Sequence, residues 1–117
     1  MDSILPIEEK YTELEQKLSQ QFADGDTVKI DAILYLIGVQ ELGKGFQQFS
    51  KDDKLNLMHI AICKIFEPFG HYKFTHHDED GWPHFEAISQ LPTMDVEQQK
   101  WKMKEAVVHY FENNKIL

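Results

Sequence analysis

Arginine is absent from this 117-residue chain, and all twelve of its basic residues are lysine. The planar guanidinium group of arginine binds phosphates and carboxylates at two points. Its absence, with a net charge of -8 and a pI near 5.1, argues against nucleic acid as a partner, because phosphate contacts dominate such binding. The same features disfavour an anionic membrane surface. Small neutral or cationic ligands, metal ions and proteins remain compatible with this composition.

Cysteine and long apolar runs are also scarce. Cys63 is the only cysteine, so no internal disulfide forms, which suits a reducing compartment. The apolar run Ala32–Ile37 is far shorter than a membrane span. The segment Met1–Lys10 is acidic and lacks the basic and apolar stretches of a signal peptide. The sequence therefore predicts a cytoplasmic protein with no membrane partner.

Length and composition predict one folded domain. A chain of this size buries roughly two-thirds of its unfolded surface, which is enough for one core. The content of 42% hydrophobic and 27% charged residues is typical of a globular domain. We expect a single helical domain over residues 1–117.

Hydrophobic periodicity predicts four helices, of which the first and the last are amphipathic. Pro6 suits the first turn of a helix that Asp24-Gly25-Asp26 then stops. The last helix is expected to begin near Asp95, with Gln98 at capping-box spacing, and to end at Asn113-Asn114. Because the first helix is amphipathic and lies near the end of the chain, we expect self-association through it as a homodimer. The apolar residues are Ile7, Tyr11, Leu14, Leu18 and Phe22 in the first helix and Trp101, Ala106, Val107, Val108, Tyr110 and Phe111 in the last.

The second helix, from about Thr27 to Leu42, is apolar on almost every side. Such a helix is usually central, so we expect the other three helices to pack around it. A buried strand over Ala32–Ile37 is the alternative, since short apolar runs are ambiguous. Gly43 and Gly45 are suited to end the helix.

The third helix is predicted to begin at Ser50, which stands at capping-box spacing from Asp53. Pro68 and Gly70 end it. The residues expected on its apolar face are Leu55, Met58, Ile62, Ile65, Phe66 and Phe69.

The residue pattern of the segment from Gly70 to Met94 differs from that of the predicted helices. Apolar and polar residues alternate over Tyr72–Thr75, and Asp80-Gly81 is a hairpin turn signal. The fold class that we predict is all-α, a four-helix bundle-like domain with a short β-hairpin or irregular loop between helices 3 and 4. An α+β fold with a two-stranded ribbon is the second choice.

Three segments carry a resemblance to a known family. They read LYLIGVQELGKG at residues 34–45, LMHIAIC at 57–63 and DEDGWPH at 78–84. The chain resembles a family of small uncharacterised proteins from Bacteroidetes-type bacteria over most of its length, from Ala32 to Phe111. No activity is assigned to that family, so the resemblance implies no functional residue.

The segment Gly38–Gly45 nearly matches a phosphate-binding loop. That motif needs Ser or Thr after its lysine to hold magnesium, and Gly45 stands there instead. The loop also needs a preceding strand in a parallel sheet, and the chain has no βαβ pattern. We therefore interpret the glycines as a helix cap and predict no cofactor.

The densest group of potential metal ligands is His76, His77, Asp78 and Asp80. Imidazole and carboxylate together suit zinc, iron or manganese. The group fails as a calcium loop, because Ala87 stands where the bidentate glutamate belongs. A solvated acidic hairpin tip is the favoured interpretation, and metal binding is the alternative.

Isolated histidines and one glutamate form a second set of candidates. His59 and Cys63 lie one helical turn apart and share a face, so they could bind one metal ion if His71 or a histidine of the long loop supplied a further ligand. A packed histidine beside a buried thiol is the favoured explanation. Glu41 projects onto a mostly buried face, where His59 is its natural partner, and such a carboxylate marks a pocket.

The run Trp82-Pro83-His84-Phe85 presents two aromatic rings around a rigid bend. A plug that closes the core is the favoured interpretation, and the wall of an apolar pocket or docking patch is the alternative. We expect a non-enzymatic interaction or ligand-binding module, with a protein partner or a small ligand at Glu41, His59, His71, Trp82 and His84. The alternative function is a small metal-binding protein or metal-dependent enzyme that uses the His/Asp-rich loop.

Overall fold

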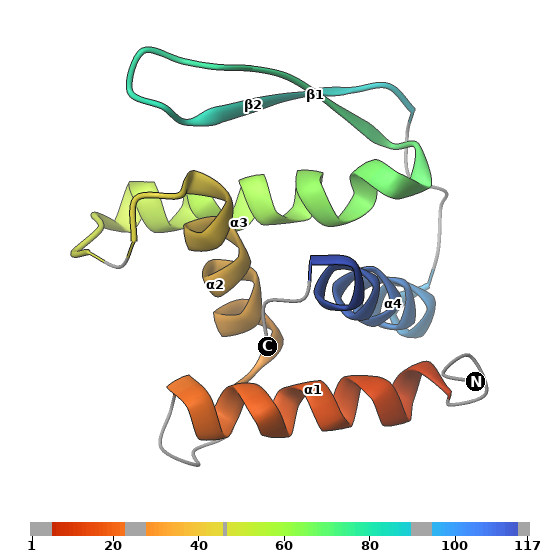
Figure 1. The fold of residues 1–117 in the computed structure, drawn as a ribbon. Coiled ribbons are helices and arrows are strands. Elements are labelled where there is room, and N and C mark those ends of the chain that lie inside the picture. The colour runs from red at the N-terminus through yellow and green to blue at the C-terminus, as the bar shows by residue number, and fades with distance from the viewer. Residues whose placement is uncertain (1–5, 23–27, 46, 90–94, 115–117) are drawn as a thin grey trace. The chain divides into compact units, whose positions relative to one another are not determined.

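The computed structural model describes residues 6–22, 28–45, 47–89 and 95–114 (Figure 1). Its contacts divide the chain into two compact units, residues 30–91 and residues 1–29 with 92–117. A single domain with the other three helices packed around the second therefore stays a prediction.

The apolar second segment is a helix, α2 (Ile30–Leu42), and not a strand. It ends where Gly43 adopts a φ of 75° and donates a hydrogen bond to the carbonyl oxygen of Val39 over 3.2 Å. This left-handed residue confirms the predicted glycine cap and explains the near match to a phosphate-binding loop. The buried residues of α2 are Ile33, Leu34, Ile37, Gly38, Val39 and Leu42.

The third helix, α3 (Lys51–Phe66), is capped by Ser50 at the predicted start and continues into a 3-10 turn, η2 (Glu67–Phe69). The prediction of its buried face was wrong at Leu55, which is 58% exposed. Both α2 and the hairpin pack on α3, so the buried residues of α3 lie on more than one face of the helix. The buried residues are Leu57, Ile60, Ala61, Cys63, Ile65 and Phe66.

The helices α2 and α3 meet at very short range. A Cβ atom on Gly38 would lie 2.2 Å from the carbonyl oxygen of Leu57 and 2.9 Å from its Cβ. Only glycine allows this approach, because no side-chain carbon fits between the two backbones. A cluster of Val39, Leu42 and Leu57 forms beside the contact, with Tyr35, Phe49 and Trp82 packed against it.

A β-hairpin follows α3, with strand β1 (Tyr72–His77) paired antiparallel to β2 (Pro83–Ala87). The hairpin lies along α3 in Figure 1, and residue contacts join both strands to that helix. The register shifts between Phe74 and His76, where the Thr75 hydroxyl donates to the carbonyl oxygen of His84 over 3.1 Å. The Asp80-Gly81 turn is confirmed, with Gly81 at a φ of 86°. The chain is therefore mostly helical but not all-α.

The other unit pairs α1 (Ile7–Phe22) with α4 (Val96–Asn114). Ion pairs link them at Lys10–Glu112 over 3.2 Å and at Lys104–Glu8 over 2.8 Å. The prediction that Trp101 belongs to the apolar packing of α4 was wrong, since its side chain is 44% exposed. The predicted stop at residues 24–26 lies outside the described residues, as does the side chain of Phe22. The buried apolar residues are Tyr11, Leu14 and Leu18 on α1 and Ala106, Val107, Val108, Tyr110 and Phe111 on α4.

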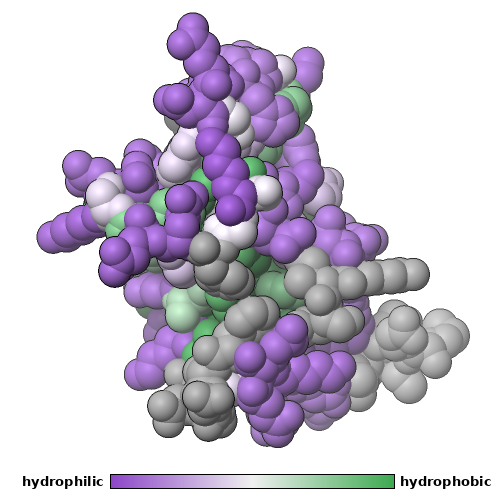
Figure 2. All heavy atoms as spheres, turned by 60° about the vertical axis from the view of Figure 1, so that its left-hand side comes forward, coloured by the Kyte–Doolittle hydropathy of each residue, from purple (hydrophilic) through white to green (hydrophobic). Residues whose placement is uncertain are grey.

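Hydrophilic residues make up most of the face shown in Figure 2, as expected for a chain rich in lysine and acidic residues. Across the described ranges, the helices are too short or too polar for any of them to cross a lipid bilayer.

Candidate functional site

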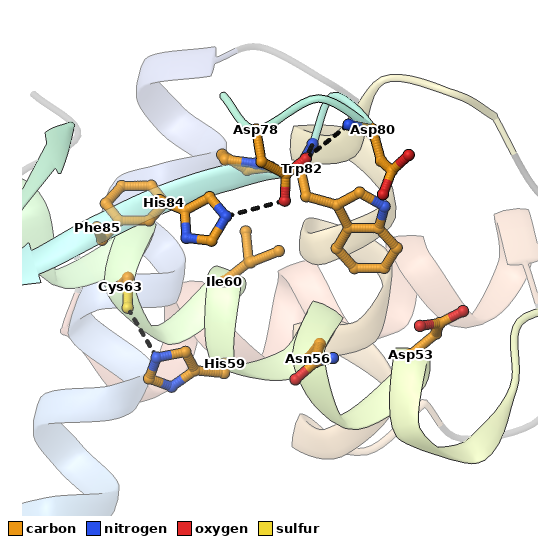
Figure 3. Close-up of a pocket in the computed structure, with 11 residues that line it drawn as sticks. Asp53, Asn56, His59, Ile60, Cys63, Asp78, Asp80, Trp82, His84 and Phe85 are labelled. Carbon is orange, nitrogen blue, oxygen red and sulfur yellow. Dashed lines mark hydrogen bonds and ion pairs between the residues drawn. The ribbon is translucent and has the colours of Figure 1, made fainter. Parts of the chain in front are cut away.

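An open cleft of about 530 Å³ lies between α3 and the hairpin (Figure 3). This volume falls within the range of roughly 300–1,000 Å³ that is typical of small-molecule sites. From α3 the cleft is lined by Asp53, Asn56, His59, Ile60 and Cys63. From the hairpin it is lined by Asp78, Asp80, Trp82, Pro83, His84 and Phe85.

The α3 side of the cleft is one helical stripe. Its residues recur at steps of three and four, the spacing that places side chains above one another on a helix. In Figure 3, Asp53 and Asn56 lie toward one end of the cleft, and Cys63 lies toward the other. The cleft therefore has a polar end where α3 begins and an end that holds the thiol.

Trp82 fixes the hairpin side of the cleft. Its ring meets that of Phe49 edge-on at a centroid distance of 6.5 Å, and Phe49 meets Tyr35 in the same way at 6.2 Å. Edge-to-face packing of this kind is favourable beyond the burial of the rings. Trp82 thus combines the features of both interpretations of this run, because it packs on the α2–α3 cluster and also lines the cleft.

Asp78 organises the hairpin turn. One carboxylate oxygen accepts hydrogen bonds from the backbone N–H groups of Asp80 (2.9 Å) and Trp82 (3.0 Å). The other lies 2.9 Å from Nε2 of His84, and the hydrogen bond between these side chains is the main reason why the pKa of Asp78 falls below its usual range. His84 also stacks on His76 with centroids 4.9 Å apart. The carboxylate therefore stays ionised and holds Trp82 and His84 in place.

We expect the turn to depend on Asp78 as a hydrogen-bond acceptor. Asp78→Ala removes the acceptor for two backbone N–H groups, so amide exchange at residues 80 and 82 should quicken at least about tenfold. Asp78→Asn keeps a side-chain carbonyl and should change exchange less. Equal exchange rates in the two variants, measured by NMR, would contradict this role.

The turn should also resist acid. A carboxyl group with a lowered pKa in the folded state stabilises the fold above its unfolded pKa, and that stabilisation is lost as the pH falls through the folded value. Protection of the same two amides should therefore persist below pH of about 4, the unfolded pKa of aspartate.

Cys63 lies at the other end of the cleft, with its Sγ 3.6 Å from Nε2 of His59. Only 1% of the Cys63 residue surface is exposed, and burial raises the pKa of its thiol to about 11. A thiolate is the nucleophilic form, so this cysteine is protonated and unreactive at neutral pH. His59 therefore contacts the thiol of its own helix, and its predicted pairing with Glu41 stays a prediction.

The thiol of Cys63 should therefore be alkylated slowly in the folded chain. At pH 8, iodoacetamide is expected to react with Cys63 at least roughly 100-fold more slowly than in the urea-unfolded chain, because two pKa units reduce the thiolate fraction by that factor. The rate should rise about tenfold for each pH unit from 8 to 10. A native rate equal to the unfolded rate would show that the thiol is neither buried nor perturbed.

The structure brings some of the predicted site residues together and separates others. His59, Asp78, Asp80, Trp82 and His84 line the cleft, whereas Glu41, His71, His76 and His77 do not. Glu41 is half-buried near the end of α2. His71 packs against Phe66 and lies 3.0 Å from the hydroxyl of Ser89, and His77 packs against Phe74.

Sequence reasoning missed Asp53 and Asn56 as cleft residues. Asp53 was assigned to helix capping alone, and Asn56 carried no signal by itself. Their spacing to Ile60 and Cys63 would have identified the stripe, but only once the hairpin was known to fold back along α3.

The described residues contain no group of three or more His, Cys, Asp or Glu side chains close enough to hold a metal ion. The rings of His76 and His84 stack on each other instead of converging on a point. Of these two histidines, His84 is the one that hydrogen-bonds to Asp78. Metal binding at His76, His77, Asp78 and Asp80 stays a prediction.

Comparison with known proteins finds no family model that matches the chain, no matching curated protein and no matching solved structure.

Proposed function

We propose that the chain is a non-enzymatic ligand-binding module and that the cleft between α3 and the hairpin is its binding site. The observation that carries this proposal is a cleft of about 530 Å³ whose walls are held by tertiary contacts. Trp82 is anchored on Phe49, and Asp78 holds the turn. A preformed cleft binds ligands with little loss of conformational entropy. Membership of the bacterial family that the sequence resembles is part of this proposal and adds no site residue.

Binding is favoured over catalysis by the state of the reactive groups. Cys63 is the strongest nucleophile by residue type in the cleft, and its high pKa keeps it protonated. His84 bonds to Asp78 on the hairpin, whereas His59 contacts the thiol from its own helix. These two histidines therefore have partners that position side chains, and neither activates an ionised nucleophile.

The experiment is a fragment screen on the full ¹⁵N-labelled chain. Cationic, anionic and neutral aromatic fragments at millimolar concentration are titrated, and amide shifts are recorded. We expect shifts at Asn56, His59, Trp82 and His84, with α1 and α4 unaffected. A screen that shifts no amide, or that shifts residues on α4, would contradict the proposal.

A matched pair of variants locates the binding. Asn56→Trp places a bulky ring in the cleft from an exposed helix position and should abolish the shifts. Leu55→Trp makes a similar change at the neighbouring position, which is 58% exposed and does not line the cleft. It should leave binding intact, and loss of binding in both variants would argue against the cleft.

A further inference from the structure

Two carboxylates lie without partners at the end of the cleft where α3 begins. Asp53 and Asp80 both line the cleft, and Figure 3 places them at the end that holds the indole of Trp82. Within the described ranges, neither carboxylate accepts a hydrogen bond or forms an ion pair. This end of the cleft therefore carries two carboxylates that have no ion-pair partner among the described residues.

Asp53 is unpaired because a capping box at α3 is only half formed. The Ser50 hydroxyl accepts the N–H of Asp53 over 3.1 Å, but the Asp53 carboxylate does not reach back to Ser50. At the start of α4 the box is complete. The backbone N–H of Gln98 donates to the Asp95 carboxylate over 2.8 Å, and the longer Gln98 side chain reaches back to accept the backbone N–H of Asp95 over 3.1 Å. The shorter side chain thus leaves a free carboxylate, which the first turn of the helix tolerates.

The other charges near this end offset only part of its negative charge, since two carboxylates face the single ammonium of Lys44. The carboxylate of Asp78 is already hydrogen-bonded, to His84 and to two backbone N–H groups. Lys44 reaches the turn but donates to the carbonyl oxygen of Asp80, and it forms no ion pair with the carboxylates of Asp53 or Asp80 among the described residues. The lining itself contains no lysine.

We infer that the cleft takes a small organic cation, with an ammonium group at Asp53 and Asp80 and an apolar body against Trp82 and Ile60. Charge complementarity selects the cation, since an anion or a neutral group would leave both carboxylates unpaired. The indole of Trp82 adds a surface that attracts cations and packs against apolar groups. This inference rests on the proposed binding function and specifies its ligand.

The test uses the full chain with Trp101→Phe, so that fluorescence reports Trp82 alone. Three probes of similar size are titrated at low salt: phenethylammonium, 2-phenylethanol and 3-phenylpropionate. We expect phenethylammonium to bind at least about tenfold more tightly than the alcohol, as charge-assisted hydrogen bonds imply, and the carboxylate to bind most weakly. Added salt should reduce this preference.

A double variant and a matched control assign the preference. Asp53→Asn with Asp80→Asn should bring the affinities for the amine and the alcohol within about threefold of each other. Asp52→Asn with Glu79→Gln removes the same net charge from exposed neighbours outside the cleft lining and should preserve the preference.

The outcomes separate the two proposals. Equal binding of the alcohol and the amine would overturn the cationic ligand while leaving the ligand-binding module intact. Binding of none of the three probes, together with a negative fragment screen, would overturn both. Tighter capture of a lysine-rich peptide than of phenethylammonium would overturn the assignment to a small free amine.

Discussion

Replacement of Gly38 by alanine is expected to destabilise the chain by about 3 kcal/mol, although alanine is the better helix former. The new Cβ would lie 2.2 Å from the carbonyl oxygen and 2.7 Å from the carbonyl carbon of Leu57. These are backbone atoms, so relief requires α2 and α3 to move apart. That movement loosens the Val39, Leu42 and Leu57 cluster on which Trp82 rests.

The measurement is the free energy of unfolding in urea, followed by circular dichroism. Gln40→Ala is the matched control, because it adds the same residue to an exposed position of the same helix and should change stability by less than about 0.5 kcal/mol. Equal or greater stability of Gly38→Ala would show that the two helices do not approach each other as described.

The second large effect is expected for Trp82→Ala, which should release the hairpin while the helices stay folded. Loss of a half-buried indole that packs on Phe49 and the α2–α3 cluster is expected to cost about 2 kcal/mol of hairpin stability. Amide exchange in β1 and β2 should quicken by roughly 30-fold, with little change in α3. Fragment binding should be lost with the cleft wall.

Trp101→Ala provides the control for this variant. Its indole is 44% exposed on α4, so its removal should leave hairpin exchange and ligand binding unchanged. If Trp82→Ala instead unfolds α2 and α3 as well, the hairpin belongs to the core and the cleft is not a separately docked site.

Local signals predicted most of the elements. Four amphipathic or apolar segments became α1 to α4, Ser50 capped α3 and Gly43 ended α2. These features depend on neighbours within a few residues, and the same is true of the Asp80-Gly81 turn. The two-stranded pairing made the fold not all-α, an alternative that the alternation at Tyr72–Thr75 had already indicated.

The errors and omissions arose from packing between distant segments. Leu55 and Trp101 are apolar residues at helical spacing, yet both are substantially exposed, because periodicity does not show how far a partner covers a helix. Gly38 is another case, since its short distance to Leu57 depends on how two helices cross. The sequence thus identified Trp82, His84 and Asp78 as candidates, but the role of Asp53 in the cleft required the hairpin to be placed on α3.

Contacts between bound phenethylammonium and the protein test the cleft most directly. Intermolecular nuclear Overhauser effects measured on the full chain should connect the probe's ring protons to the indole protons of Trp82 and to the methyl groups of Ile60. Those two residues lie on the hairpin and on α3, so joint contacts place the ligand between them. Contacts to Trp101 or Val96 on α4, without any to Trp82 and Ile60, would contradict a binding site in the cleft.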